Sequence, residues 1–230
     1  MRAAIAGDVL SCSDDADVIG NSSDNCVAQP FRTLAAEALG AGNASVGWHA
    51  PLPWLLVRPA CAQDVSTVVR LVAELAARGV WGNPRARACK GAESPLYVAG
   101  GGHSELGALT TNSVVLDMRP YFSAVEVHAA AREVGVGAGA RLGEVATALR
   151  GTGLAAPVGV HPTVGVGLML QGGLGRLART HGLSVDAIAA AEVVTPDGNL
   201  RYLRAGSSGI SMVRHDGAPK AVRIHSTTAA

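Results

Sequence analysis

Residues 97–107 read YVAGGGHSELG, a short apolar run followed by three consecutive glycines, a histidine and a serine. Consecutive glycines allow backbone N–H groups to approach a ligand closely and to form a nest for an anion such as a pyrophosphate. The loop opens no clear helix, lacks GxGxxG spacing and has no P-loop lysine, which argues against a Rossmann site or a nucleoside triphosphatase. Taken alone, the stretch is more simply explained as a glycine turn with an exposed histidine.

A second glycine-rich segment, residues 159–175, reads GVHPTVGVGLMLQGGLG and has the character of an uncharged loop. Two such loops, separated by several strands, are suited to hold one long, flat, diphosphate-bearing ligand from both sides. The alternative is that the second loop provides tight backbone packing between two lobes. The residues alone leave both interpretations open.

Composition excludes several classes of function. The 19 Lys and Arg residues nearly balance 18 Asp and Glu residues, and aromatic residues make up only 3% of the chain, so a nucleic-acid partner has little support. The longest uncharged span, residues 151–175, contains eight glycines and two prolines, so no membrane-spanning helix is expected. The four cysteines have no metal-site spacing, and no metal is predicted.

Short strands alternate with a few helices without a strict βαβ repeat, which indicates an α+β fold. Residues 65–76 show the clearest helical period, with Gly79 as a C-cap, and residues 142–150 and 31–39 predict two more helices. The residues after Arg204 show no apolar period and are assigned no structure. The predicted strands are residues 55–57, 96–99, 114–118, 124–128, 134–137, 188–195 and 200–203, of which 124–128 and 134–137 are expected to pair.

Seven stretches occur in a family-specific order: VRPACAQDVSTVV, VAGGGHSELG, VVLDM, VGVGAGARLGEVATAL, GVHPTVGVGLMLQGGLGRL, HGLSVDAI and EVVTPDGNL. Together they resemble the FAD-linked oxidases with a para-cresol methylhydroxylase-type (PCMH-type) FAD-binding domain, in particular the berberine bridge enzyme-like group. The resemblance covers about residues 51–203 and implies two α+β subdomains, the second incomplete. Residues 1–50 are then expected to be a partly disordered leader with one helix, and residues 204–230 a divergent tail.

The resemblance also implies a set of cofactor-binding residues. His103 matches the histidine that the family bonds covalently to the 8α-methyl group of FAD, and a neutral imidazole nitrogen is a competent nucleophile for such a bond. The backbone around it matches the pyrophosphate-binding loop: Gly100, Gly101, Gly102, Ser104 and Gly107. The remaining matched positions are Gly139, His161, Val164, Gly165, Gly167, Gly172, Gly173 and Val194.

Two departures from the family pattern and one matching position refine this expectation. Ala99 stands where many members have an arginine, and His161 stands where many have a cysteine that forms a second covalent bond. A single covalent link through His103 is therefore predicted, with His161 either at the flavin edge or an ordinary loop histidine. Val164 matches the position that gates oxygen, and a valine there resembles the oxygen-reactive form, which favours an oxidase.

The resemblance implies an FAD-dependent oxidase that passes a hydride from a small-molecule substrate to the flavin and reduces oxygen. The substrate domain and its catalytic base are not recognisable after EVVTPDGNL, and Tyr202 is interpreted as a strand residue. The alternative is a non-catalytic flavin-binding module or a gene fragment. Sequons at Asn21 and Asn43 suggest a secretory route, although the N-terminus is a poor signal peptide.

Overall fold

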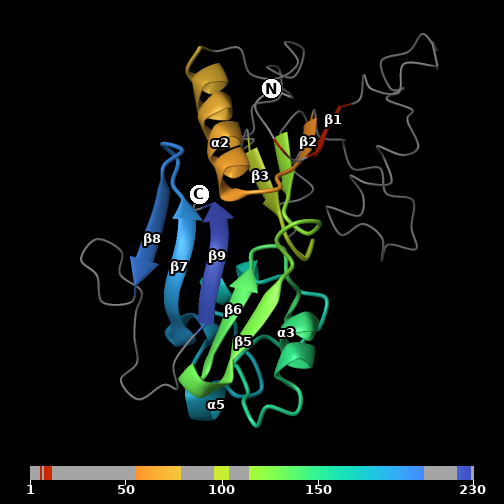
Figure 1. Cartoon of the computed structure of the whole chain (residues 1–230), viewed down its shortest axis with the longest axis vertical. Helices are drawn as coiled ribbons and strands as arrows, with labels where there is room; N and C mark the ends of the chain where they lie inside the picture. The colour runs from red at the N-terminus through yellow and green to blue at the C-terminus, as the bar shows by residue number, and fades with distance from the viewer. Residues whose placement is uncertain are drawn as a thin grey trace, which may run out of the picture.

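The computed structural model describes Ala6 and residues 8–11, 55–78, 96–103, 114–204 and 222–228. This part of the chain forms two sheets. In the view of Figure 1 the four-stranded sheet lies at the upper right, and the five-stranded sheet lies below it and to the left. The four-stranded sheet with its covering helix is called the first lobe, and the five-stranded sheet with its helices the second lobe. This mixed architecture confirms the predicted α+β class.

The first lobe has the strand order β1-β2-β4-β3. The strands β2, β4 and β3 run parallel, and β1 pairs with β2 in the antiparallel direction. All four residues of β4 are buried, as expected for a strand between two neighbours with both faces covered. The elements are β1 (Asp8–Ser11), β2 (Leu55–Arg58), α2 (Ala62–Ala77), β3 (Leu96–Ala99) and β4 (Val114–Asp117).

Helix α2 forms because its valines repeat at helical spacing. Val65, Val68 and Val72 lie on one face and are at most 3% exposed, in one core with β2 and β4. At the start of the helix, the Asp64 carboxylate accepts hydrogen bonds from the N–H groups of Ala60 at 2.9 Å and Ala6 at 2.8 Å. A carboxylate in the first turn also interacts favourably with the helix dipole.

The second lobe has the strand order β5-β6-β9-β7-β8. Strand β9 lies in the middle and pairs in parallel with both β6 and β7, whereas the outer pairs β5–β6 and β7–β8 are antiparallel. Helix α3 packs on this sheet through Leu142, Val145 and Leu149. The elements are β5 (Val125–His128), β6 (Glu133–Gly137), α3 (Leu142–Leu149), α4 (Gly167–Leu170), α5 (Ala178–His181), β7 (Ile188–Val194), β8 (Leu200–Arg204) and β9 (Val222–Thr228).

Most of the predicted elements are confirmed, the strands to within one residue and the clearest helix to within about three residues at their ends. They include the clearest helix, the pair β5–β6 and the strand β3 that leads into the glycines. The predicted helix at residues 31–39, the C-cap at Gly79 and the sequons at Asn21 and Asn43 lie outside the described residues.

Three expectations are wrong. Residues 8–11 form β1 although only a leader and a helix were expected before residue 51, and residues 222–228 form β9 although no structure was assigned after Arg204. Both strands pair into the two sheets, so the folded unit extends beyond residues 51–203 on either side. Residues 167–170 form the short helix α4 within the segment expected to be a loop. The reason is shared: strand pairing and one-turn helices depend on contacts with distant residues more than on local periodicity.

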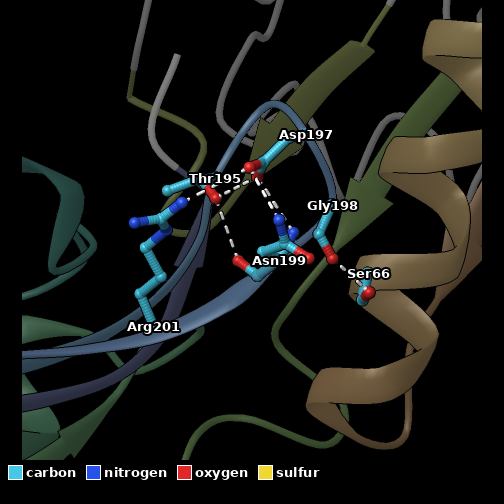
Figure 2. Close-up of polar contacts among 6 residues, drawn as sticks. All are labelled: Ser66, Thr195, Asp197, Gly198, Asn199 and Arg201. Carbon is cyan, nitrogen blue, oxygen red and sulfur yellow. Dashed lines mark hydrogen bonds and ion pairs between the residues drawn. The ribbon is translucent and has the colours of Figure 1, made fainter.

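A turn between β7 and β8 connects the two lobes (Figure 2). The Asp197 carboxylate accepts hydrogen bonds from the Asn199 backbone N–H at 3.1 Å, from its side-chain amide at 2.7 Å and from the Thr195 hydroxyl. Gly198 adopts φ +75°, and its carbonyl accepts a hydrogen bond from the buried Ser66 hydroxyl of α2. The turn of the second lobe is thereby fastened to the helix of the first.

The same contacts hold the pKa of Asp197 well below its usual range. The Thr195 hydroxyl contributes most, followed by the Asn199 backbone and side-chain N–H groups, and the charge of Arg201 adds to them. All of these groups favour the ionised carboxylate. The ionised form is therefore the one that stabilises the folded turn.

We expect Ser66→Ala to lower the free energy of unfolding by about 1–3 kcal/mol, because it leaves the buried Gly198 carbonyl without its donor. Thr67→Ala is the matched control, since among the described residues that hydroxyl bonds only the Gln63 carbonyl of the same helix, and its effect should stay within about 0.5 kcal/mol. Urea denaturation of both variants measures the difference. Equal effects would contradict a connection between the lobes at Ser66.

We expect the stability difference between the unaltered chain and Asp197→Asn to depend on pH. A lowered folded-state pKa means that the carboxylate stabilises the fold above the unfolded-state pKa of about 3.9, and that this contribution is lost as the pH falls further. The difference in denaturation midpoint should be largest at neutral pH and shrink below about pH 4. A difference that stays constant across this range would refute the role of the ionised carboxylate.

Candidate functional site

The first glycine segment leaves the carboxyl end of β3 and turns sharply. Gly102 has φ +69°, a left-handed conformation that residues with a side chain rarely adopt. His103 follows directly and is exposed. The glycine turn thus delivers an imidazole to the surface at the edge of the first sheet.

The two glycine-rich segments touch each other directly. A Cβ atom on Gly101 would lie 2.0 Å from the backbone nitrogen of Gly165, and one on Gly165 would lie 2.3 Å from that of Gly101. Such distances leave no room for a side chain at either position, nor for a ligand between the two glycines. Of the two interpretations of the second segment, close backbone packing therefore holds at this point, and the segments form one continuous surface.

Three successive backbone donors on this surface are unpaired. In the described part of the chain, the N–H groups of Gly100, Gly101 and Gly102 have no hydrogen-bond acceptor. All three residues are partly exposed. Unpaired neighbouring N–H groups at a turn provide a site for an anion, and no side chain at these positions blocks the approach.

Beside this turn, three side chains form a hydrogen-bonded cluster. Thr163 Oγ1 lies 2.6 Å from His103 Nε2 and 2.9 Å from His161 Nδ1. The two imidazole rings have centroids 5.3 Å apart and are tilted by 52°. The structure thus brings together the two histidines that the sequence analysis selected. Thr163, which connects them, was not selected individually, and its only sequence signal is its place in the His-Pro-Thr stretch.

Other predicted positions surround the same region. Val164 follows the cluster, and its side chain is partly buried against the core of the second lobe. Gly167 begins α4 with no atom within 4 Å of a Cβ built on it. Gly139 donates its N–H to the Phe122 carbonyl at 3.0 Å. Its neighbour Ala138 places a carbonyl 3.3 Å from a Cβ built on Gly100, so this segment borders the glycine turn.

The remaining described positions, Gly172, Gly173 and Val194, make contacts that stabilise the fold. The carbonyl of Gly173 accepts hydrogen bonds from the Ser184 hydroxyl at 2.8 Å and the Ser184 N–H at 3.1 Å, and Gly172 accepts from the Val185 N–H at 3.0 Å. Val194 ends β7 fully buried in the core of the first lobe. Their contacts are structural. Ser104 and Gly107 lie outside the described residues.

A polar cavity of about 330 Å³ lies next to Gly139, and the sequence analysis did not anticipate it. At its wall, the fully buried Asp117 carboxylate pairs with Arg119 at 3.1 Å and with Arg58 at 3.3 Å. The signal was present in the sequence, since Arg58 and Asp117 end two neighbouring parallel strands. Among the described residues, no cluster could hold a metal ion and no helix is long and apolar enough to cross a membrane.

Comparison with known families explains this arrangement. The profile of a family described as an FAD binding domain matches residues 85–204, more than half of the chain. The chain belongs to this FAD-binding family. The match includes the glycine turn, His103 and the second glycine segment, so the predicted family is confirmed.

Individual relatives agree with the family. The chain is 32% identical over 158 residues to (R)-6-hydroxynicotine oxidase of Paenarthrobacter nicotinovorans, covering 68% of this chain and 31% of the relative. It is 39% identical over 111 residues to berberine bridge enzyme-like 5 of Arabidopsis thaliana, covering 46% of this chain and 21% of the relative. The first of these relatives is named as an oxidase, and the second carries the name of the berberine bridge enzyme-like group that the motif order predicted.

The fold is shared with solved flavoenzymes. The crystal structure of 6-hydroxy-D-nicotine oxidase from Arthrobacter nicotinovorans superimposes with a TM-score of 0.62 at 27% identity, covering 87% of this chain and 36% of that one. The predicted PCMH-type FAD-binding fold is therefore confirmed. The chain spans about a third of the length of the two nicotine oxidases and about a fifth of the length of berberine bridge enzyme-like 5.

We expect Gly101→Ala to lower the free energy of unfolding by about 1–3 kcal/mol, because the added methyl group meets the backbone of Gly165. Gly167→Ala is the matched control, since its methyl group meets open space in a short helix, and it should leave the stability unchanged or slightly higher. Thermal denaturation distinguishes the two. A Gly101→Ala chain as stable as the control would show that the two segments do not pack as described.

Proposed function

We propose that this FAD-binding chain holds FAD covalently through His103 and forms the cofactor-binding part of an oxidase. The observation that carries the proposal is the run of N–H groups from Gly100 to Gly102, which have no acceptor among the described residues and lead to an exposed imidazole. A diphosphate needs such donors, and a covalent bond to a flavin methyl group needs an accessible nucleophile.

The residues present fit the cofactor. The three N–H groups would bind the diphosphate without help from a lysine, as expected for a loop that lacks the P-loop pattern. His103 would fix the dimethylbenzene end of the ring, with Thr163 and His161 beside it. No cysteine lies at position 161, which supports a single covalent bond.

When bound, FAD supplies a two-electron acceptor that takes a hydride from a substrate C–H bond and passes the electrons on to oxygen. The chain's own contribution is to bind and orient the cofactor. Close packing of the two glycine segments places the N–H groups of residues 100–102 and His103 on one rigid surface, because no flexible side chain lies between Gly101 and Gly165.

Two points support the proposal that oxygen is the electron acceptor. Val164 matches the position that gates oxygen in the family, and its side chain is small and partly buried next to the cluster. A relative with 32% identity is named as an oxidase. We propose that the substrate is a small molecule. The resemblance to the family indicates no narrower chemical class for it.

A second candidate is a flavin-binding module without turnover of its own. Hydrogen peroxide formation with a panel of sugars, alcohols and cyclic amines distinguishes the candidates. Peroxide with any of them supports the oxidase, whereas covalent flavin without peroxide supports the module.

We expect flavin to remain in the pellet when the FAD-reconstituted chain is precipitated in acid, and His103→Ala to release it. His128→Ala is the matched control, because this histidine is also exposed but ends β5, away from the glycine turn. The visible absorbance of the pellet and the mass of the tryptic peptide measure the bond. Flavin retained by His103→Ala, or absent from the unaltered pellet, would refute the covalent assignment.

A further inference from the structure

The polar cavity beside Gly139 is lined by arginines from three different elements. Arg58 ends β2, Arg119 follows β4 and Arg141 lies immediately before α3. The charged and hydroxyl side chains of the cavity wall are Arg58, Asp117, Arg119, Ser123, Arg141 and Glu144. Three of them are guanidinium groups and two are carboxylates, so the wall has a formal net charge of +1.

Both carboxylates of the wall already accept hydrogen bonds. The fully buried Asp117 carboxylate accepts from Nε of Arg119 at 3.1 Å and from Nε of Arg58 at 3.3 Å. The Glu144 carboxylate accepts from the backbone N–H of Arg141 at 2.6 Å, at the start of α3. The guanidinium of Arg141 forms no ion pair with either carboxylate, so it is the source of the excess positive charge.

The terminal amino groups of Arg58 and Arg119 are donors without acceptors. Each of these guanidinium groups is held through Nε, and its two terminal nitrogens have no acceptor among the described residues. The two side chains are only 17% and 19% exposed, so most of each is removed from bulk water. Donors that lose water and gain no acceptor are costly, whereas a charged acceptor in the cavity would satisfy them.

We infer that this cavity is a binding site for a phosphate group, either free or carried by a small molecule. Guanidinium groups that reach one cavity from three elements match the several oxygens of a tetrahedral dianion better than the two coplanar oxygens of a carboxylate. The Ser123 hydroxyl supplies a further donor. The cavity volume of about 330 Å³ leaves room for a small organic group attached to the phosphate.

This site is separate from the backbone N–H groups to which the FAD diphosphate is assigned, because none of residues 100–102 lines the cavity. The two sites are nevertheless neighbours, since Arg141 forms a bridge with Gly165, which packs on Gly101. A phosphate in the cavity would connect the arginines of the first lobe to Arg141, at the start of a helix of the second lobe. The inference does not depend on the covalent attachment proposed above.

Isothermal titration calorimetry of the full chain, reconstituted with FAD, tests the site with inorganic phosphate. We expect one phosphate to bind per chain. No binding would overturn the inference, and binding to the FAD-free chain alone would also overturn it, because the cavity would then belong to the cofactor site.

Two further ligands define the chemistry that the cavity accepts. Phenyl phosphate that binds more tightly than inorganic phosphate would identify a phosphate ester as the ligand, and the reverse order would identify the free ion. Both orders support the inference. Succinate that binds more tightly than either phosphate would overturn the assignment to a phosphate group.

We expect Arg141→Gln to weaken phosphate binding about tenfold, because it removes charge-assisted hydrogen bonds to the ion. Its melting temperature in phosphate-free buffer should stay unchanged, since the Arg141 guanidinium has no acceptor in the described part of the chain. Arg179→Gln is the matched control, because this exposed arginine of α5 does not line the cavity. Its phosphate affinity should stay within about twofold.

Two results with these variants would overturn the site. An unaltered affinity in Arg141→Gln would show that phosphate binds elsewhere on the chain. Equal weakening in Arg141→Gln and Arg179→Gln would show that phosphate responds only to the overall charge of the chain and is an adventitious ion only. Both variants are also titrated without FAD, so that a failure of cofactor binding does not prevent the comparison.

Discussion

The contact between Gly101 and Gly165 is the constraint on which the site depends. It joins the loop that follows β3 to the segment before α4 with no side chain between the two backbones. Gly165 also forms a bridge with Arg141, immediately before α3, so the same point connects the glycine turn to a helix of the second lobe. A larger residue at either position would separate the two lobes where they need to be continuous.

This contact explains why the histidines meet. His103 follows Gly101 by two residues, and Thr163 precedes Gly165 by two, so fixing the glycines against each other sets the two short stretches side by side. The hydroxyl of Thr163 then lies within reach of both imidazoles. The cluster is therefore a geometric consequence of close backbone packing. The N–H groups before His103 have no acceptor in the part of the chain that the structure describes.

Contacts elsewhere in the fold connect the two lobes. The Ser66 hydroxyl of α2 fastens the β7–β8 turn, and the core of the first lobe takes in Ala138 and Val194 from the second. At the edge of the first sheet, the buried Asp117 carboxylate holds Arg58 and Arg119. A buried carboxylate with two cations is costly to disturb, which keeps the carboxyl ends of β2 and β4 fixed beside the segment that contains Gly139.

The sequence by itself determined the α+β class, helix α2 from the spacing of its valines, the pair β5–β6 and the family of the glycine turn with His103. Each of these is encoded by local periodicity or by motif order. Only the tertiary structure decided that β1 and β9 join the sheets, that Gly101 packs on Gly165, and that Thr163 connects the two histidines. These features pair residues about 60 or more positions apart or depend on strands placed by their neighbours, and no local pattern specifies such contacts.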